Sequence, residues 1–442
     1  MKVYFIGIGG SGMLPLAHLA AESGHEVYGC DPKARAQAGL IVYNDIDPGR
    51  IASVDAVVFS SAIPADHPEL VVAKNRNSKG ELKLYHRMDF LRELLAQNPI
   101  RIGIAGTHGK TSTTSIAGWV LLQIGLDPTI FAGGRPKYLE QGMRKGNGPA
   151  VFETDESDGS FLKSGANVRL ALNVDRDHLD HYGNELALHE AFRQFAIEGE
   201  IAVLNAEDPV LRGIDGAVYY STNADFPADY QGRFMGQTDD LEVFRGKERI
   251  GALSVSLPGR HFASNALGLF ALLDTLRSNG LINFERGTLL AAFETFPGVE
   301  RRMELIGTVN GAEVYDDYGH HPSEIAAVLS ALRIRNPGKR IRIVFQPHRF
   351  TRTKEHGVGF ANVLALADEC WILPLYSAGE QPIPGVDSEW IVQLTGNRAR
   401  MTSASELQVL FKTAQSGDII LFQGAGDVSS MAHAALKRAQ ET

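Results

Sequence analysis

The sequence predicts an α/β protein built from three domains, and three observations lead to this prediction. Short apolar runs alternate with segments of helical periodicity almost throughout, a pattern typical of parallel sheets covered by helices. Two glycine-rich turns each follow an apolar run and precede a helix, so each is expected to open a separate sheet. A chain of 442 residues has room for roughly three domains of about 150 residues. We place these domains at residues 1–98, 99–298 and 299–442.

The composition excludes several classes of protein. Hydrophobic residues make up 44% and the formal net charge is −9, which excludes a disordered chain and argues against non-specific nucleic-acid binding or a polybasic membrane contact. Cys30 and Cys370 are too few cysteines for a disulfide framework or a zinc ribbon. The apolar start is shorter than a signal peptide, and no run approaches the roughly 18 apolar residues of a membrane span. We therefore expect a soluble, cytoplasmic protein without nucleic-acid or membrane partners.

The first domain begins with a buried strand at residues 3–8, a helix from Met13 and a second strand at 25–30. The turn between the first strand and the helix, Gly7-Ile8-Gly9-Gly10-Ser11-Gly12, fits the pattern G-x-G-x-x-G, and Asp31 follows the second strand. Such a turn lets the backbone approach a pyrophosphate at a helix N-terminus, with a carboxylate available for a sugar hydroxyl. The pattern indicates a diphosphate ligand, NAD among the possibilities; a turn that only packs a helix on a strand is the alternative.

The second domain carries a stronger phosphate-binding pattern. Gly106-Thr107-His108-Gly109-Lys110-Thr111 lies between a strand at 102–105 and a helix. Backbone amides of such a loop cradle a polyphosphate, Lys110 supplies a point charge, and the Thr111 hydroxyl is a candidate ligand for Mg²⁺. Ile104 stands where a strict P-loop has its first glycine, so the loop is shorter.

Two acidic segments follow strands of the second domain. Glu153-Thr154-Asp155-Glu156-Ser157-Asp158 comes after residues 150–152, and Asp177-His178-Leu179-Asp180-His181 comes after a strand at 170–174. Because binding sites of open parallel sheets gather at the carboxyl ends of the strands, these segments indicate a divalent cation or phosphate site. A solvated loop and a structural histidine are the alternatives. Residues 219–258 alternate in a way that predicts an antiparallel hairpin.

The third domain begins after Phe296-Pro297-Gly298 and is predicted to be another open parallel sheet, with strands at 341–345, 371–375 and 418–423, a helix around 358–367 and a closing helix. Arg301-Arg302 opens it, and Asp316-Asp317-Tyr318-Gly319-His320-His321-Pro322 precedes a helix from Ser323. In Gln346-Pro347-His348-Arg349-Phe350-Thr351-Arg352, two arginines and a histidine follow a strand. This stretch indicates either a clamp for carboxylate or phosphate or a solvated basic turn.

Taken in order, these motifs resemble the Mur ligase family. The resemblance runs from Gly7 to the closing Gln423-Gly424-Ala425-Gly426, through Gly-Thr-His-Gly-Lys-Thr, Asp-Glu-Ser-Asp, Asp-Tyr-Gly-His-His-Pro and Gln-Pro-His-Arg-Phe-Thr-Arg-Thr. It implies a Rossmann-like N-terminal domain for a UDP-sugar and a central P-loop-type ATPase domain with a mainly parallel sheet and a small antiparallel hairpin. A Rossmann-like C-terminal domain for nucleotide and amino acid completes the expected fold.

The resemblance also implies an activity. It is the ATP-dependent joining of L-alanine to UDP-N-acetylmuramate through an acyl phosphate, giving ADP and phosphate, a step of peptidoglycan precursor synthesis. ATP and Mg²⁺, with Mn²⁺ as a substitute, would be the cofactors, and both a monomer and a homodimer remain open. The alternatives are a recycling ligase that attaches a murein tripeptide to the same nucleotide sugar, a dinucleotide-dependent oxidoreductase built on Gly7–Gly12, and a non-catalytic nucleotide-binding protein.

The site residues that the resemblance implies fall into four sets. UDP-N-acetylmuramate would face Gly9, Gly10, Ser11, Gly12, Met13, Asp31, Ser60 and Ser61. ATP would contact Gly106, Thr107, His108, Gly109, Lys110, Thr111, Ser112, Asn265, Arg302, Asp317, Tyr318 and His320. L-alanine would be recognised by His348, Arg349 and Arg352. Thr111, Glu153 and His178 would hold metal, and Lys110, Glu153 and His178 would be catalytic.

The chain departs from the family pattern at three places. Many members carry a carbamoylated lysine after the Asp-His pair, but here no lysine occurs between Lys163 and Lys247, and His189 stands in the aligned stretch. Phe262 replaces an asparagine of the adenine motif, and His86-Arg87 stands where paired arginines are common.

Overall fold

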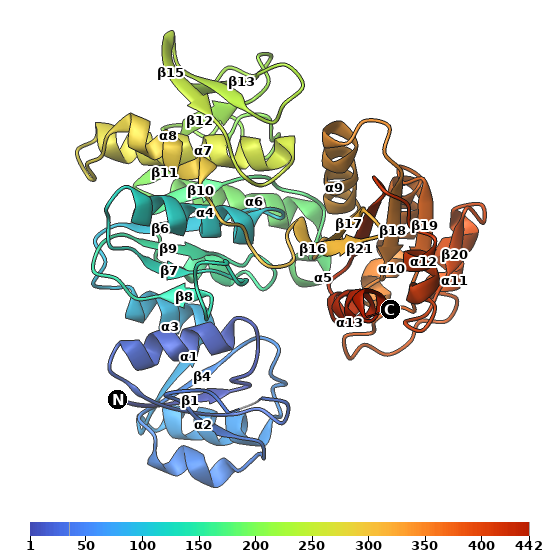
Figure 1. Ribbon diagram of the computed structural model, residues 1–442. Helices are drawn as coiled ribbons and strands as arrows, with labels where there is room; N and C mark the ends of the chain where they lie inside the picture. The colour runs from blue at the N-terminus through green and yellow to red at the C-terminus, as the bar shows by residue number, and fades with distance from the viewer. Residues whose placement is uncertain (35, 442) are drawn as a thin grey trace. The chain divides into compact units, whose positions relative to one another are not determined.

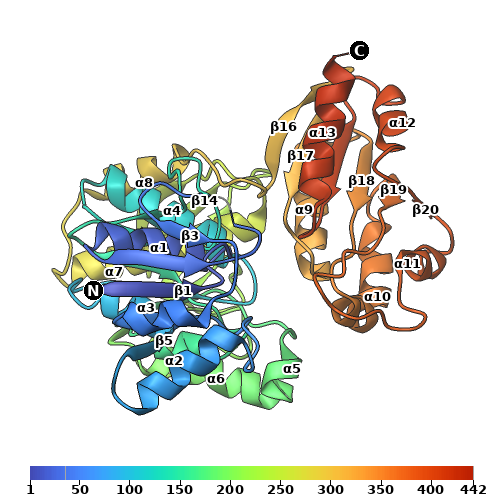
Figure 2. The ribbon, with the colours of Figure 1, turned by 90° about the horizontal axis from the view of Figure 1, so that it is seen from below.

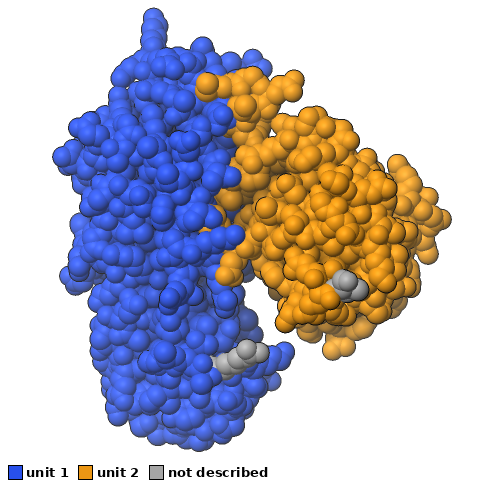
Figure 3. Space-filling model, in the orientation of Figure 1, with its two compact units in different colours: residues 1–234, 240–256, 263–297 blue, residues 235–239, 257–262, 298–442 orange. Residues whose placement is uncertain are grey.

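The structure is a computed structural model that describes residues 1–34 and 36–441 (Figure 1). These residues form two compact units (Figure 3). Unit 1 consists of residues 1–234, 240–256 and 263–297, and unit 2 of residues 235–239, 257–262 and 298–442. Within the described residues, unit 1 holds a five-stranded and a ten-stranded sheet and unit 2 a six-stranded sheet. The predicted α/β fold with mainly parallel sheets is confirmed.

The N-terminal sheet is wholly parallel, with the strand order β3-β2-β1-β4-β5. Its elements are β1 Lys2–Ile6, α1 Met13–Glu22, β2 Glu26–Cys30, β3 Ile41–Tyr43, β4 Ala56–Phe59, α2 Pro68–Ser78, β5 Lys83–His86 and α3 Arg87–Leu94. Alternation along β1 sends Phe5 into the apolar core under α1 and α3, and Ile6 into the core under α2. The strand ends at Ile6, short of the predicted limit, because Gly7 turns the chain with a φ of 75°.

The core under α1 and α3 does not stop at residue 98. It continues through apolar side chains of the second predicted domain, including Phe131, Met143 and Phe152. This shared core explains why residues 1–98 belong to the same compact unit as the ten-stranded sheet.

The central sheet has the order β15-β14-β13-β12-β11-β10-β6-β9-β7-β8. Its strands are β6 Arg101–Ala105, β7 Thr129–Phe131, β8 Met143–Arg144, β9 Ala150–Glu153, β10 Val168–Ala171, β11 Ile201–Asn205, β12 Val218–Ser221, β13 Tyr230–Phe234, β14 Leu241–Arg245 and β15 Glu248–Leu253. Its helices are α4 Lys110–Gln123, α5 Leu179–Tyr182, α6 Glu185–Ile197, α7 Arg260–Ser278 and α8 Arg286–Glu294. The pairings are parallel except for β7 with β8 and for β13, β14 and β15, so the predicted antiparallel hairpin is confirmed.

A buried carboxylate fastens this hairpin region to the helices of unit 1. Asp274 of α7 is fully buried and accepts hydrogen bonds from Tyr230 of β13 at 2.9 Å and from Arg286 of α8 at 2.8 and 2.9 Å. Burial alone would raise the pKa of Asp274, but the hydrogen bonds from Arg286 and Tyr230 outweigh burial and lower that pKa.

Unit 2 has the strand order β16-β17-β21-β18-β19-β20. Its elements are β16 Glu304–Val309, β17 Ala312–Asp317, α9 Pro322–Arg335, β18 Ile341–Phe345, α10 Phe350–Leu364, β19 Glu369–Ile372, α11 Ser388–Leu394, β20 Ala399–Met401, α12 Leu407–Lys412, β21 Ile419–Gln423 and α13 Val428–Gln440. Helix α13 lies against β17 and β21, and its apolar side chains share a core with those of α12 (Figure 2).

Two predictions for the third domain are wrong in detail. Its sheet is not wholly parallel, because β16 pairs with β17 in antiparallel fashion. Helix α10 begins at Phe350, well before the predicted 358. The early start is stabilised from a distant loop, since Glu380 accepts hydrogen bonds from the backbone N–H and the hydroxyl of Thr351. None of the helices in the described part of the chain combines the length and the apolar character needed to cross a membrane.

Candidate active site

The first glycine-rich turn and Asp31 lie together, as predicted. The N–H groups of Gly7 and Ile8 both donate to the carbonyl oxygen of Cys30, at 2.9 and 3.1 Å. The Gly9 N–H donates to Oδ2 of Asp31 at 3.1 Å, and a Cβ at position 9 would lie 2.8 Å from that oxygen. Gly12 caps α1, so the turn lies at a helix N-terminus, where the helix dipole stabilises an anion.

The second glycine-rich turn is held in place by Asn173, which belongs to none of the motifs described above. The Asn173 side chain accepts from the His108 N–H at 2.8 Å and donates to the His108 carbonyl oxygen at 3.1 Å, while the Asn173 carbonyl accepts from the Thr107 N–H. Gly109 caps α4 with a φ of 84°. An amide that bonds to both main-chain groups of one loop residue fixes the loop before any ligand binds. From the sequence, Asn173 is expected inside the strand at 170–174, whereas in the structure β10 ends at Ala171 and leaves Asn173 beside the turn.

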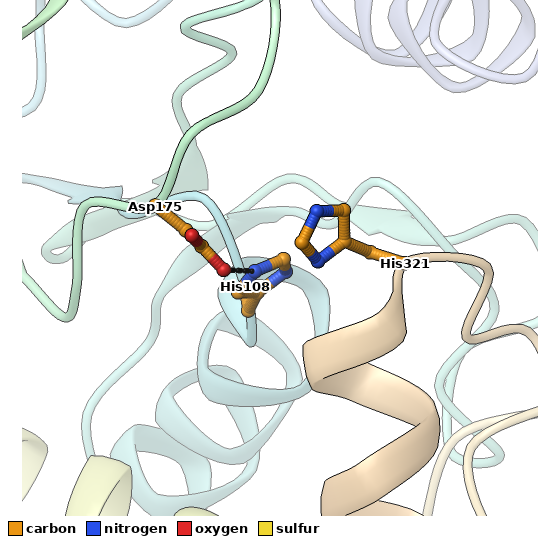
Figure 4. Close-up of side chains that lie close together, drawn as sticks. All are labelled: His108, Asp175 and His321. Carbon is orange, nitrogen blue, oxygen red and sulfur yellow. Dashed lines mark hydrogen bonds and ion pairs between the residues drawn. The ribbon is translucent and has the colours of Figure 1, made fainter. Parts of the chain in front are cut away.

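His108, a predicted ATP contact, is paired with a carboxylate. Its Nε2 lies 2.9 Å from Oδ2 of Asp175, as Figure 4 shows. The Asp175 N–H in turn donates to the hydroxyl of Thr107 at 2.9 Å. The chain after β10 therefore supports the turn by side-chain and main-chain contacts.

Lys110 lies at the centre of the carboxylates of unit 1. Its Nζ donates to the Gly106 carbonyl oxygen at 2.6 Å and to Glu156 at 2.8 Å. Burial works to lower the pKa of Lys110, but the attraction of Glu156 and the neighbouring carboxylates outweighs it and the pKa is raised. Burial raises the pKa of Glu156 to about 7 against the opposing attraction of Lys110. Lys110 is therefore a held positive charge beside the phosphate-binding turn.

The side chains predicted to hold metal offer the ligand atoms that Mg²⁺ prefers. The Thr111 hydroxyl donates to Oε2 of Glu153 at 2.8 Å, so two oxygen ligands lie together at the N-terminus of α4. His178 adopts a φ of 58°, and its Nε2 lies 3.6 Å from Asp177 and 3.9 Å from Glu156. Thr111 and Glu153 thus fit a hard cation, with His178 near the same carboxylate segment.

The acidic segment 153–158 contacts two different parts of unit 1. Glu153 and Glu156 face the phosphate-binding turn, whereas Asp155 pairs with Arg87 of α3. Asp158 accepts from the hydroxyl of Ser61 at 2.8 Å, the residue predicted to contact the UDP-sugar. Burial would raise the pKa of Asp158, but hydrogen bonds from His86, Ser160 and Ser61 lower it strongly. The segment joins the edges of the two sheets of unit 1.

In unit 2, Asp317 and Tyr318 lie at the carboxyl end of β17. Asp317 is almost fully buried and accepts from the Met303 N–H, the Gly319 N–H and Nε2 of Gln423, at 2.7 to 2.8 Å. The Arg302 guanidinium carbon lies 5.2 Å from the centre of the Tyr318 ring, and that of Arg301 lies 4.9 Å from it. The hydrogen bonds of Asp317 thus fix the backbone beside Tyr318, a predicted ATP contact.

The predicted amino-acid residues lie close together in unit 2. Nη1 of Arg352 is 3.4 Å from Nδ1 of His348, and Arg349 caps α10 with a φ of 71°. Burial, with a contribution from Arg352, lowers the pKa of His348 to about 4, and burial lowers the pKa of His320 to about 3. Both imidazoles are therefore neutral at physiological pH.

The remaining predicted residues are placed as follows. Ser112 is buried in α4, and Ser60 is half-buried at the end of β4. Asn265 of α7 is also buried, and its Nδ2 lies 2.3 Å from the position that a Cβ on Gly109 would take. The Asn265 side chain therefore lies against the phosphate-binding turn of unit 1.

Three family models match successive parts of the sequence. The Mur ligase family catalytic domain matches residues 2–98, the Mur ligase middle domain matches residues 104–273, and the Mur ligase glutamate ligase domain matches residues 301–426. The chain belongs to the Mur ligase family. Proteins of this family named UDP-N-acetylmuramate–L-alanine ligase are similar over the whole length. The one from Dictyoglomus turgidum is 36% identical over 100% of this chain and 97% of its own length, and the one from Aquifex aeolicus is 35% identical over 99% and 97%.

Solved structures of Mur ligases resemble this one. The UDP-N-acetylmuramate–alanine ligase of Thermotoga maritima has a TM-score of 0.84 and 27% identity, with 100% of this chain and 99% of that chain covered. The murein peptide ligase of Psychrobacter arcticus has a TM-score of 0.70 at 23% identity, over 100% and 99%, and shows the fold alone.

Proposed function

We propose that this Mur ligase joins L-alanine to UDP-N-acetylmuramate and converts ATP to ADP and phosphate. The observation that carries the proposal is the position of Lys110, a held cation beside a braced phosphate-binding turn and a carboxylate-rich strand edge. The identity of the substrates is supported by full-length relatives whose names state that reaction. A dinucleotide-dependent oxidoreductase would leave this turn and its carboxylates unexplained.

The first chemical step activates a carboxylate, which is itself a poor acyl donor. The lactyl carboxylate of the nucleotide sugar attacks the γ-phosphorus of ATP, the bond to the β-phosphate oxygen breaks, and ADP leaves. Lys110 stabilises the charge that collects on the transferring group. Mg²⁺ held by Thr111 and Glu153, with His178 at a second site, would neutralise further phosphate charge; Mn²⁺ can take the same oxygen ligands.

In the second step the free amine of L-alanine attacks the acyl carbon, and the bond from that carbon to the phosphate oxygen breaks. Phosphate leaves with the electron pair of this bond, and the nitrogen loses a proton to phosphate or water as the amide forms. Arg349 and Arg352 would hold the carboxylate of alanine and orient its amine. Because His348 and His320 are neutral, they add no positive charge that would repel an ammonium group entering beside them.

We assign the remaining roles on the basis of the family resemblance. Residues 1–98 would bind the UDP-sugar through Gly9–Met13, Asp31, Ser60 and Ser61, residues 99–298 would carry the ATPase function, and residues 299–442 would contribute to nucleotide and amino-acid binding. In addition to the turn 106–112, the nucleotide contacts would be Asn265, Arg302, Asp317, Tyr318 and His320.

An ATP-dependent phosphate-release assay tests the proposal. With UDP-N-acetylmuramate present, we expect release with L-alanine, its abolition by EDTA, and its recovery on adding Mg²⁺ or Mn²⁺. Release with the murein tripeptide and none with L-alanine would reject the proposed acceptor. Binding of NAD without binding of ATP in a thermal-shift measurement would reject the reaction class.

A further inference from the structure

A row of four ring side chains follows the carboxyl edge of the sheet in unit 2. The Tyr318 and His320 rings lie 5.4 Å apart between centres, His320 and His348 lie 6.0 Å apart, and His348 and Tyr376 lie 5.5 Å apart. The last two rings are nearly parallel, at an interplanar angle of 6°. The first three members were predicted to contact nucleotide or amino acid. Tyr376, after β19, has no assigned role.

Tyr376 is fixed in place by its neighbours. Its N–H donates to the Pro347 carbonyl oxygen and its carbonyl accepts from the Arg349 N–H, both at 2.8 Å. Gly426 lies directly against it, because a Cβ at that position would be 2.9 Å from Cβ and Cγ of Tyr376. Nevertheless 40% of Tyr376 is exposed. The backbone of Tyr376 is therefore fixed on the predicted amino-acid segment, and its ring stacks on His348 while it remains accessible to a ligand.

The position of the Tyr376 ring within unit 2 suggests its role. The carboxylate of the amino acid is expected on Arg349 and Arg352, next to His348. The Tyr376 ring stacks on the His348 ring, and the Tyr376 carbonyl oxygen accepts from the Arg349 N–H, so Tyr376 borders the same site. The side chain of an amino acid that is bound there through its carboxylate is therefore within reach of the Tyr376 ring.

We propose that Tyr376 limits the size of the amino acid side chain and so makes the ligase selective for alanine. The proposal rests on the proposed function, since it concerns the same acceptor site. A methyl group fits against a ring that stacks on His348 and has Gly426 against its Cβ and Cγ, whereas a branched side chain would have to displace the ring. A hydrophobic contact of one methylene separates amino acids by about 10- to 200-fold in kcat/KM, which is the scale expected for such a wall.

The experiment compares Tyr376→Ala, Tyr376→Phe and wild type in the phosphate-release assay with L-alanine and L-valine. In Tyr376→Ala we expect the ratio of kcat/KM for L-alanine to that for L-valine to fall at least about tenfold. Tyr376→Phe keeps the bulk of the ring and should keep the ratio within about twofold. The KM values for ATP and UDP-N-acetylmuramate should stay unchanged in both. Leu366→Ala, at an exposed residue beyond α10, is the control for a surface truncation in unit 2.

Each outcome decides the matter. An unchanged ratio in Tyr376→Ala, in protein that melts as wild type does, overturns the proposal. So does a ratio lost equally in Tyr376→Phe, because the hydroxyl rather than the ring would then discriminate. If Tyr376→Ala melts at a lower temperature than wild type, the ratio of kcat/KM is measured in Tyr376→Leu instead, because leucine leaves a smaller cavity than alanine. If the wild-type protein ligates only a tripeptide, the proposed function is rejected. The proposal that Tyr376 limits the size of a free amino acid then fails for that separate reason.

Discussion

The carboxyl edges of the central sheet and of the sheet in unit 2 carry opposite charge. In unit 1, Lys110 lies among carboxylates of the segment 153–158, and Arg87 pairs with Asp155 of the same segment. In unit 2, Arg349 and Arg352 stand beside the neutral imidazole of His348, and Arg302 lies over the Tyr318 ring. A carboxylate-rich edge accepts a polyphosphate only together with a metal cation, whereas a guanidinium-rich edge binds a carboxylate directly. The difference explains how an acidic protein handles anionic substrates in two ways.

The largest effect on activity is expected when Lys110 is removed from the carboxylate-rich edge of the central sheet. Lys110→Met should lower kcat for ATP-dependent phosphate release by about 10³-fold, because it removes the positive charge that is held beside the phosphate-binding turn. Steady-state kinetics measure the effect, and Lys79→Met, at an exposed lysine after α2, is the control. A loss of less than tenfold would show that the cation of this edge is not used in catalysis.

A substitution among the arginines of unit 2 should change the KM for L-alanine rather than kcat. Arg352→Ala is expected to raise the KM for L-alanine by about 10- to 100-fold, because a hydrogen bond to a charged group contributes about 1.5–3 kcal/mol. The KM for ATP should remain as in wild type. Arg400→Ala, which removes an exposed arginine stacked on Trp371, is the matched control. Equal rises in the KM values for ATP and L-alanine would contradict a carboxylate clamp at Arg352.

A smaller effect is expected from the residue that braces the phosphate-binding turn. Asn173→Ala removes both hydrogen bonds to the His108 main chain and should raise the KM for ATP about tenfold. Asn205→Ala removes an amide that bonds to the Leu172 carbonyl but not to the turn, so it is the control. If both variants change the KM for ATP equally, Asn173 acts through strand stability rather than through the turn.

The smallest effect concerns the pH dependence of unit 2. The pKa of His348 is lowered to about 4 in the folded protein, so between pH 6.5 and pH 4 the unfolded chain binds a proton that the folded chain does not. Stability therefore falls as the pH falls through this window. In His348→Gln, the drop in Tm from pH 7.5 to pH 4.5 should be smaller than in wild type by about 3 °C. Parallel curves for the two proteins would show that His348 does not carry this dependence.

Local sequence predicted the parts of the site that are contiguous in the chain. The strand–turn–helix patterns at Gly7–Gly12 and Gly106–Thr111 are confirmed, because glycine at fixed spacing determines backbone conformation within a few residues. The segment 153–158 was predicted to lie at a strand end, and it does, after β9. The roles of these residues toward substrate stay predictions.

The partners of those residues were decided by the tertiary structure. Asn173 meets His108 and Tyr376 meets His348 because the order of strands in a sheet brings distant strand ends together. Asp155 meets Arg87 because the two sheets of unit 1 pack through a shared core. Helix α10 begins early because Glu380, far along the chain, satisfies its first turn. The sequence by itself determined which backbone segments can bind an anion, since that depends on local conformation. Which side chains support those segments was decided only by folding, because such contacts depend on strand order rather than on spacing along the chain.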